Sequence, residues 1–165
     1  MTRPTNFTRL NTSEGYYVNG SVVIDSSGNV VVDPAEIQPP KIAFIQETVA
    51  FGDFTDGGGA AGTIDLSTDI PLGAVVTQSF IDDVTGFAGD TSAVVTIGDG
   101  TDVDRYNTGT PDVFTTATAI SAGAVSGTAF HSAAKTPTIT VTSAADWGSV
   151  TAGQMTITIA YYQST

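Results

Sequence analysis

Alternation of apolar and polar residues is the strongest signal along this chain. It is clearest over residues 138–142 and 154–162, where Ile, Val, Met and Tyr alternate with Thr or Ala. A period of two places the apolar side chains on one face of a β-strand. Further strands are predicted at 41–51, 63–66, 74–84, 94–97 and 113–120. In residues 41–51 both alternating sets are partly apolar, so this strand is expected to be covered on two sides.

These segments predict an all-β protein. They are rich in Thr and Val, which lowers helix propensity and suits a pleated surface. Short strands separated by Gly, Pro, Asn and Asp are typical of a sandwich. We expect a jelly-roll-like β-sandwich domain over residues 41–165, with about eight strands. The glycine-rich run at 53–62 is expected to be a flexible connection, because it lacks the Lys and Ser/Thr of a phosphate-binding loop.

Residues 1–40 are predicted to form an extended N-terminal arm with a β-hairpin. Residues 1–14 are polar and show no periodicity. In 16–33, the apolar residues of 16–18 and 21–24 are expected to form one side of the hairpin, followed by a turn at Gly28 and Asn29 and a return over 30–32. An isolated hairpin is marginal in water, so it should dock on the main domain or on a neighbouring subunit. Pro39 and Pro40 mark the boundary. The residues expected to contact a partner or subunit are Arg3, Phe7, Arg9, Leu10, Tyr16 and Tyr17.

Charge narrows the range of partners. The chain of 165 residues carries 17 acidic and five basic residues, for a net charge of −12. Binding to nucleic acid or to anionic membranes needs clustered Lys and Arg, so neither partner is expected. There is no cysteine, which excludes disulfides, thiolate metal sites and a cysteine nucleophile. No apolar run of 18 residues and no signal-like N-terminus is present, so no membrane span or secretion signal is expected.

The stretch from Gly86 to Phe114, GFAGDTSAVVTIGDGTDVDRYNTGTPDVF, is the place where site chemistry is most expected. A buried strand at 94–97 is followed by Asp99, Asp102 and Asp104, which are candidate oxygen ligands for Ca²⁺. The spacing departs from an EF-hand loop, because Thr101 and Val103 stand where ligands should be. The alternative is an ordinary turn, and we expect no cofactor.

Candidates for catalysis are few. The one histidine, His131, lies in a run of small residues, and no Gly-x-Ser-x-Gly elbow accompanies it. Asp82 and Asp83 are adjacent on a predicted strand, so they should face opposite sides and form a poor acid–base pair. Three aromatic residues could form a sugar-stacking platform or belong to the core; these are Trp147, Tyr161 and Tyr162. We therefore expect no catalytic residue and no enzymatic activity.

The region 51–162, and above all the stretch 86–114 quoted above, resembles the capsid decoration or cement proteins of tailed bacteriophages. The resemblance implies a non-enzymatic structural protein of the virion, with an N-terminal arm and a β-sandwich. It further implies a homotrimer on the outer surface of an icosahedral head, clamping the major capsid protein. The family has no catalytic residues to carry over.

Two alternatives remain open. One is a phage tail or fibre component that binds a host glycan, and the other is a carbohydrate-binding or hydrolytic β-sandwich module. A glycan-binding protein should expose Trp147 or the pair Tyr161 and Tyr162 in a concave groove. A cement protein should bury these aromatics, and a hydrolase should have a pocket where carboxylates with shifted pKa values converge.

Overall fold

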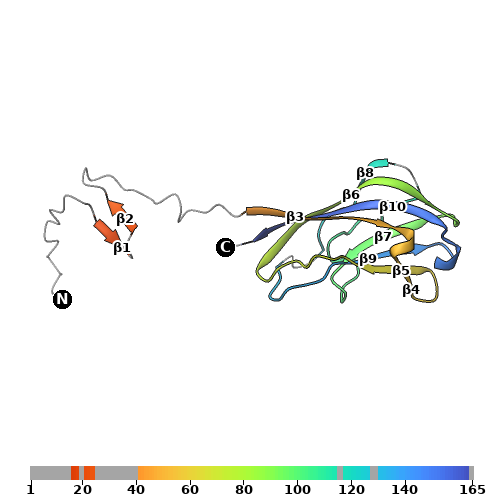
Figure 1. Ribbon diagram of the computed structural model, residues 1–165, viewed down its shortest axis with the longest axis horizontal. Helices are drawn as coiled ribbons and strands as arrows, with labels where there is room; N and C mark the ends of the chain where they lie inside the picture. The colour runs from red at the N-terminus through yellow and green to blue at the C-terminus, as the bar shows by residue number, and fades with distance from the viewer. Residues whose placement is uncertain (1–15, 19–20, 25–40, 115–116, 127–129, 164–165) are drawn as a thin grey trace. The chain divides into compact units, whose positions relative to one another are not determined.

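The computed structural model describes residues 16–18, 21–24, 41–114, 117–126 and 130–163 (Figure 1). Of these, residues 16–18, 21–24 and 117–119 are described by their backbone alone. The chain divides into two units, Met1–Pro39 and Pro40–Thr165. Each unit is described by itself below.

The described part of the first unit is a two-stranded hairpin that differs from the predicted one. Strand β1 (Tyr16–Val18) pairs antiparallel with β2 (Ser21–Ile24). The prediction that residues 16–24 form one side of the hairpin is therefore wrong. The sequence Asn-Gly between the two strands is a strong signal for a two-residue hairpin connection, and it explains the difference. The predicted turn at Gly28 and Asn29 lies outside the described residues.

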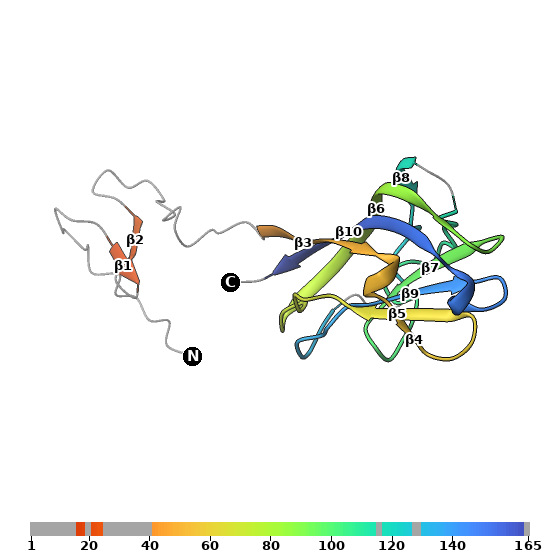
Figure 2. The same ribbon diagram turned by 45° about the vertical axis from the view of Figure 1, so that its right-hand side comes forward.

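The second unit is a β-sandwich of two antiparallel sheets, as predicted (Figures 1 and 2). The first sheet has the strand order β3-β10-β6-β8, and the second has the order β4-β5-β9-β7. The strands of the first sheet are β3 (Lys41–Ala50), β10 (Ala152–Gln163), β6 (Ala74–Ala88) and β8 (Ala117–Ser121). Those of the second are β4 (Thr55–Asp56), β5 (Ala61–Asp65), β9 (Thr138–Ser143) and β7 (Ala93–Gly98). Two short 3₁₀ turns, Phe51–Asp53 and Trp147–Ser149, join strands.

The topology is that of a jelly roll. From β5 onward, successive strands alternate between the two sheets, and the last strand, β10, lies beside the first, β3. The glycine-rich run is more ordered than predicted, because β4 and the start of β5 form a small hairpin within it. The strand predicted at 113–120 is also different. Val113 instead joins the edge of β7 through the amide of Val113 and the carbonyl of Ala93, 2.8 Å apart, and β8 begins at Ala117.

Strand β6 breaks the period of two that its sequence suggests. Its register against β10 shifts at three places, each of which adds one residue to β6. The inward positions are therefore three residues apart at each bulge, as at Val76 and Ser79 and again at Ile81 and Val84. Asp83 lies in one bulge with φ of 50°. The bulge leaves Asp82 half-buried and Asp83 exposed, and it interrupts the regular strand on which the prediction for this pair depended.

The core fills the space between the sheets. Met155, Ile157 and Ile159 of β10 are fully buried against Ile139 and Val141 of β9 and their neighbours. At one end Phe54, Phe87 and Trp147 form an aromatic cluster with ring centroids 5.3–6.4 Å apart. Gly62 passes so close to the Trp147 ring that a Cβ there would overlap it. Among the described residues no helix is long and apolar enough to cross a bilayer.

Candidate functional site

The acidic turn after β7 is built around one buried carboxylate, that of Asp99. Its Oδ1 accepts hydrogen bonds from the amides of Thr101 and Asp102, at 3.0 and 2.9 Å. Its Oδ2 lies 3.6 Å from Nε of Arg105 and 3.7 Å from Nζ of Lys135. Burial opposes the charged form, but the two amides and the two cations outweigh it, so the pKa of Asp99 lies below its usual value. The carboxylate therefore stays ionised and holds the turn closed.

The other two calcium candidates do not join Asp99. Asp102 is half-buried and Asp104 is exposed. Within the described part of the chain, no three His, Cys, Asp or Glu side chains gather as metal ligands would. The turn comes so close to β7 that a Cβ on Gly98 would overlap the backbone of Asp102 and Val103. Asp99 thus has a structural use here, as an acceptor for amides and a counter-ion for two cations.

His131 lies behind this turn, in contact with Tyr106. The Tyr106 hydroxyl and His131 Nε2 are 3.0 Å apart and hydrogen-bonded, and both side chains are buried. Burial, then the positive charge of Arg105, lowers the pKa of His131; Lys135 adds to this and Asp99 opposes it. Burial, followed by the negative charge of Asp99, raises the pKa of Tyr106 well above its usual value. At neutral pH the pair is therefore an uncharged hydrogen bond inside the fold.

Backbone contacts show what the pair positions. The amide of His131 donates to the carbonyl of Ala74, and the amide of Tyr106 donates to that of Ile97, at 2.9 and 2.8 Å. The hydroxyl of Ser79 donates to the Tyr106 carbonyl at 2.6 Å. The cluster thus ties the segment after β7 to the start of β6. No serine hydroxyl is among the contacts found for His131 within the described residues, so this part of the chain shows no Ser–His pair.

Two residues of this region were not singled out by the sequence. The Asn107 side chain accepts from the amide of Ile97 at 2.6 Å and donates to the carbonyls of Val95 and Gly109. Lys135 comes from a distant segment to reach Asp99. By sequence, a lone Asn in a Gly- and Thr-rich loop is an ordinary turn residue. Nothing in the pattern indicates that its side chain bonds to backbone groups of β7 in the way a neighbouring strand would.

The aromatic candidates are divided between core and surface. Trp147 is buried in the aromatic cluster, and Tyr161 is half-buried. Tyr162 is exposed and lies opposite Ile42 and Val75 of the neighbouring strands. Trp147 is thus part of the core, as expected of a cement protein. Tyr162 is exposed, so the prediction that a cement protein buries all three aromatics is wrong for this residue.

The candidate contacts of the arm are placed only in part. Arg3, Phe7, Arg9 and Leu10 lie outside the described residues, and Tyr16 and Tyr17 are in β1 with only their backbone described. Their role in contacting a partner remains a prediction.

Comparison with known proteins gives a fold but no family. No protein-family model matches the sequence, and no curated protein matches it. The structure is similar to a solved chain described as the cyanophage Pam1 capsid asymmetric unit, with a TM-score of 0.52. The match has 17% sequence identity and covers 85% of this chain and 97% of that one. At this identity the likeness shows a shared fold.

Proposed function

We propose that this protein is a non-enzymatic structural protein of a bacteriophage virion, and that it decorates the outer surface of the capsid as a cement protein. The observation that carries the proposal is the fold shared with a chain of a phage capsid asymmetric unit, over 97% of that chain. The resemblance of the stretch 86–114 to decoration proteins supports the same role.

The arrangement around Asp99 favours a structural role over a catalytic one. Its carboxylate is engaged by amides and cations, and the buried Tyr106 and His131 are bonded to each other. These are groups that a hydrolase would need to present to a substrate. A protein that adheres to a surface needs a rigid domain and contact surfaces, and the sandwich supplies the domain.

We further propose that the protein is a homotrimer, that its partner is the major capsid protein, and that the N-terminal arm contributes to docking. Many weak contacts made at once by several copies and arms give lasting attachment through multivalency.

The test is co-sedimentation of the purified protein with expanded capsids that lack decoration. We expect saturation at a fixed ratio of this protein to the major capsid protein. The full-length variant Arg3→Ala/Phe7→Ala/Arg9→Ala should bind more weakly, and Thr5→Ala/Thr8→Ala, in the same arm, should bind like the wild type. Absence of saturable binding by a folded protein would refute the cement role, and equal binding by the two variants would refute the role of the arm.

A further inference from the structure

The outer face of the first sheet carries an apolar row that crosses four chain segments. Ile42 of β3 pairs with Tyr162 of β10, Tyr162 pairs with Val75 of β6, and Val75 forms a bridge with Phe130. Directly opposite residues of antiparallel strands project to the same face. All four side chains are exposed, from 37% for Tyr162 to 50% for Phe130. We call these four residues the apolar row.

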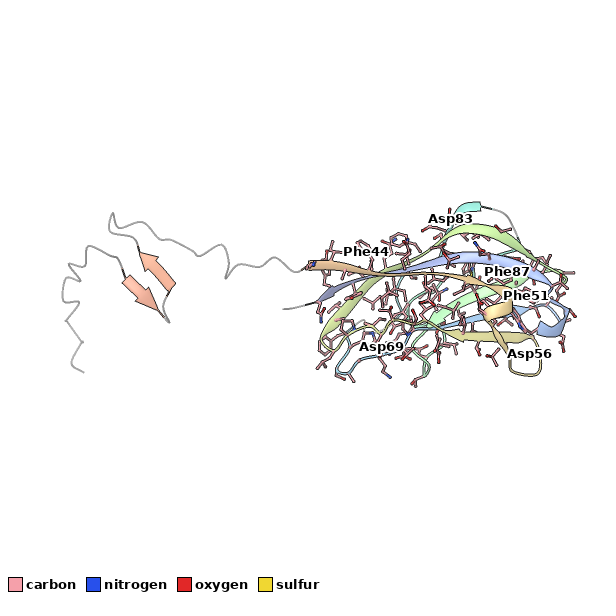
Figure 3. The ribbon with its side chains drawn as sticks, viewed as in Figure 1. Phe44, Phe51, Asp56, Asp69, Asp83 and Phe87 are labelled. Atoms are coloured by element: carbon pink, nitrogen blue, oxygen red, sulfur yellow. The ribbon has the colours of Figure 1, made fainter. Side chains whose placement is uncertain are left out.

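Two more exposed aromatics extend the apolar row along the same face. Phe44, two residues after Ile42, is 62% exposed, and Figure 3 shows it pointing away from the second sheet. Phe80 lies opposite Thr158 and is 36% exposed. The four aromatic side chains alone expose roughly 400 Å², taking about 200 Å² for a whole ring side chain. Ile42 and Val75 enlarge this area, and the exposed Gln46 and Gln78 lie on the same face. A standard interface takes roughly 800 Å² from each partner.

Much of this face is free of acids, although the protein is strongly acidic. Three successive rows contain no ionisable acid: the apolar row, then Phe44 with Ala160 and Gln78, then Gln46 with Thr158 and Phe80. The next row contains the first acid, Asp82. The whole chain has a net charge of −12. A basic partner would be attracted to the acidic parts of the surface, whereas another acidic molecule can approach closely only where no carboxylates are brought together.

The sequence of β3 also indicates that another element or molecule packs on its outer face. Both alternating sets of this strand are partly apolar, which is typical of a strand buried on two sides. The inner set, with Ile45 and Val49, is buried, but the outer set begins with the exposed Ile42 and Phe44. Strand β3 is also an edge of its sheet within the described part of the chain. A long edge strand beside an apolar face is a common site of association between chains.

We infer that three copies of this protein meet around a threefold axis through the outer face of β3, β10 and β6, with the apolar row and Phe44 next to the axis. The occupants are further copies of the chain, because each is an acidic molecule whose corresponding face is free of acids over the same three rows. The inference deepens the proposed function in that it supplies the interface of the proposed trimer. The inference concerns the association of copies in solution, so it is tested without capsids.

Analytical ultracentrifugation of the full chain without capsids provides the test. We expect the wild type to sediment at about three times the 16.8 kDa of one chain. Phe44→Lys places a charge at the centre of the contact and should weaken association at least 100-fold. Val103→Lys makes the same change of charge at a side chain 60% exposed in the acidic turn, and it should keep the wild-type mass.

A second measurement covers the case in which Phe44→Lys does not fold. The chain has no cysteine, so Phe44→Cys and Val103→Cys each introduce one thiol. We expect a maleimide to label Cys at 44 at least tenfold more slowly than Cys at 103 in the assembled protein, and equally fast after dilution to monomer. A monomeric wild type, an unchanged mass of Phe44→Lys, loss of mass in Val103→Lys, or equal labelling of the assembled variants would each overturn the inference. A monomer that still saturates capsids would leave the cement role intact.

Discussion

The turn around Asp99 buries a charged side chain, whereas the outer face around Phe44 exposes large apolar side chains; both are contrary to the usual preference of these residues. Asp99 is a charged group that is buried, and amides and cations surround it. Phe44 and the apolar row are large apolar groups left in solvent, at one end of the same sandwich. The first arrangement is complete within one chain, whereas the second would be completed by another molecule.

The difference indicates where to look for function when the described residues form no evident active site. Buried polar groups are normally satisfied, and a satisfied cluster explains itself as part of the fold. A contiguous exposed apolar patch remains unexplained by the fold and marks an interaction surface. By this criterion the acidic turn is structural, and the apolar row with Phe44 is the surface where we expect a partner to bind.

The largest effect on stability is expected from Asp99→Ala. The substitution removes the acceptor of two amides and leaves the positive charges of Arg105 and Lys135 without this counter-ion. We expect a loss of about 3 kcal/mol in the free energy of unfolding, since both cations are partly exposed and solvent screens them. Urea denaturation followed by tryptophan fluorescence measures it, because the single Trp147 is in the core.

Asp99→Asn is the matched control for the turn. Its amide oxygen can still accept hydrogen bonds from the amides of Thr101 and Asp102, but it carries no charge. We therefore expect the free energy of unfolding to fall by about half as much as in the alanine variant. If both variants were as stable as the wild type, the turn would not depend on the buried carboxylate.

An intermediate effect on stability is expected when His131 is protonated at low pH. The folded protein holds its pKa below the ordinary 6.5, so the unfolded chain binds a proton more readily. The contribution of His131 is therefore complete above pH 6.5 and is lost as the pH falls from there through the lower pKa of the folded state. We expect the wild type to lose stability between pH 7.5 and 5.5, by at most about 1.4 kcal/mol per pH unit.

His131→Gln should reduce this dependence on pH. Glutamine can still bond to the Tyr106 hydroxyl but does not titrate, and no second histidine is present in the chain. Asp99 does not contribute in this range, because its stabilisation is lost only as the pH falls below its ordinary 3.8. Melting curves at the two pH values measure the effect, and an equal slope in the variant and the wild type would show that His131 is not the group responsible.

The sequence predicted the sandwich because the large apolar side chains of β9 and β10 alternate along each strand. Burial itself alternates in β9, whereas residues 155–160 of β10 are all buried. It did not predict the bulges of β6, because an inserted residue such as Asp83 depends on the register against β10. The hairpin of β1 and β2 could have been predicted, because Asn-Gly lies between the apolar residues of 16–18 and 21–24. Lys135 beside Asp99 was not, because the two are joined by the fold and not by any local pattern.

The apolar face likewise could be predicted only in part from the sequence. Alternation in residues 41–51 correctly gave Ile42 and Phe44 a common face and suggested that something covers it. Their alignment with Tyr162, Val75 and Phe130 is a matter of strand register, which no single segment contains. Pattern identifies which side chains share a strand face, and topology decides which strands combine these faces into one surface.

The smallest effect on the stability of the single chain is expected from Phe44→Lys, the substitution with the largest effect on assembly. Phe44 is 62% exposed, so the monomer gains little from its burial. The lysine stem can lie along the sheet with its charge in water. Urea denaturation at a concentration where both proteins are monomeric should therefore give free energies of unfolding within about 0.5 kcal/mol. A loss of several kcal/mol would place Phe44 in the core of the monomer, and the dissociation of the variant would then reflect unfolding and not a broken interface.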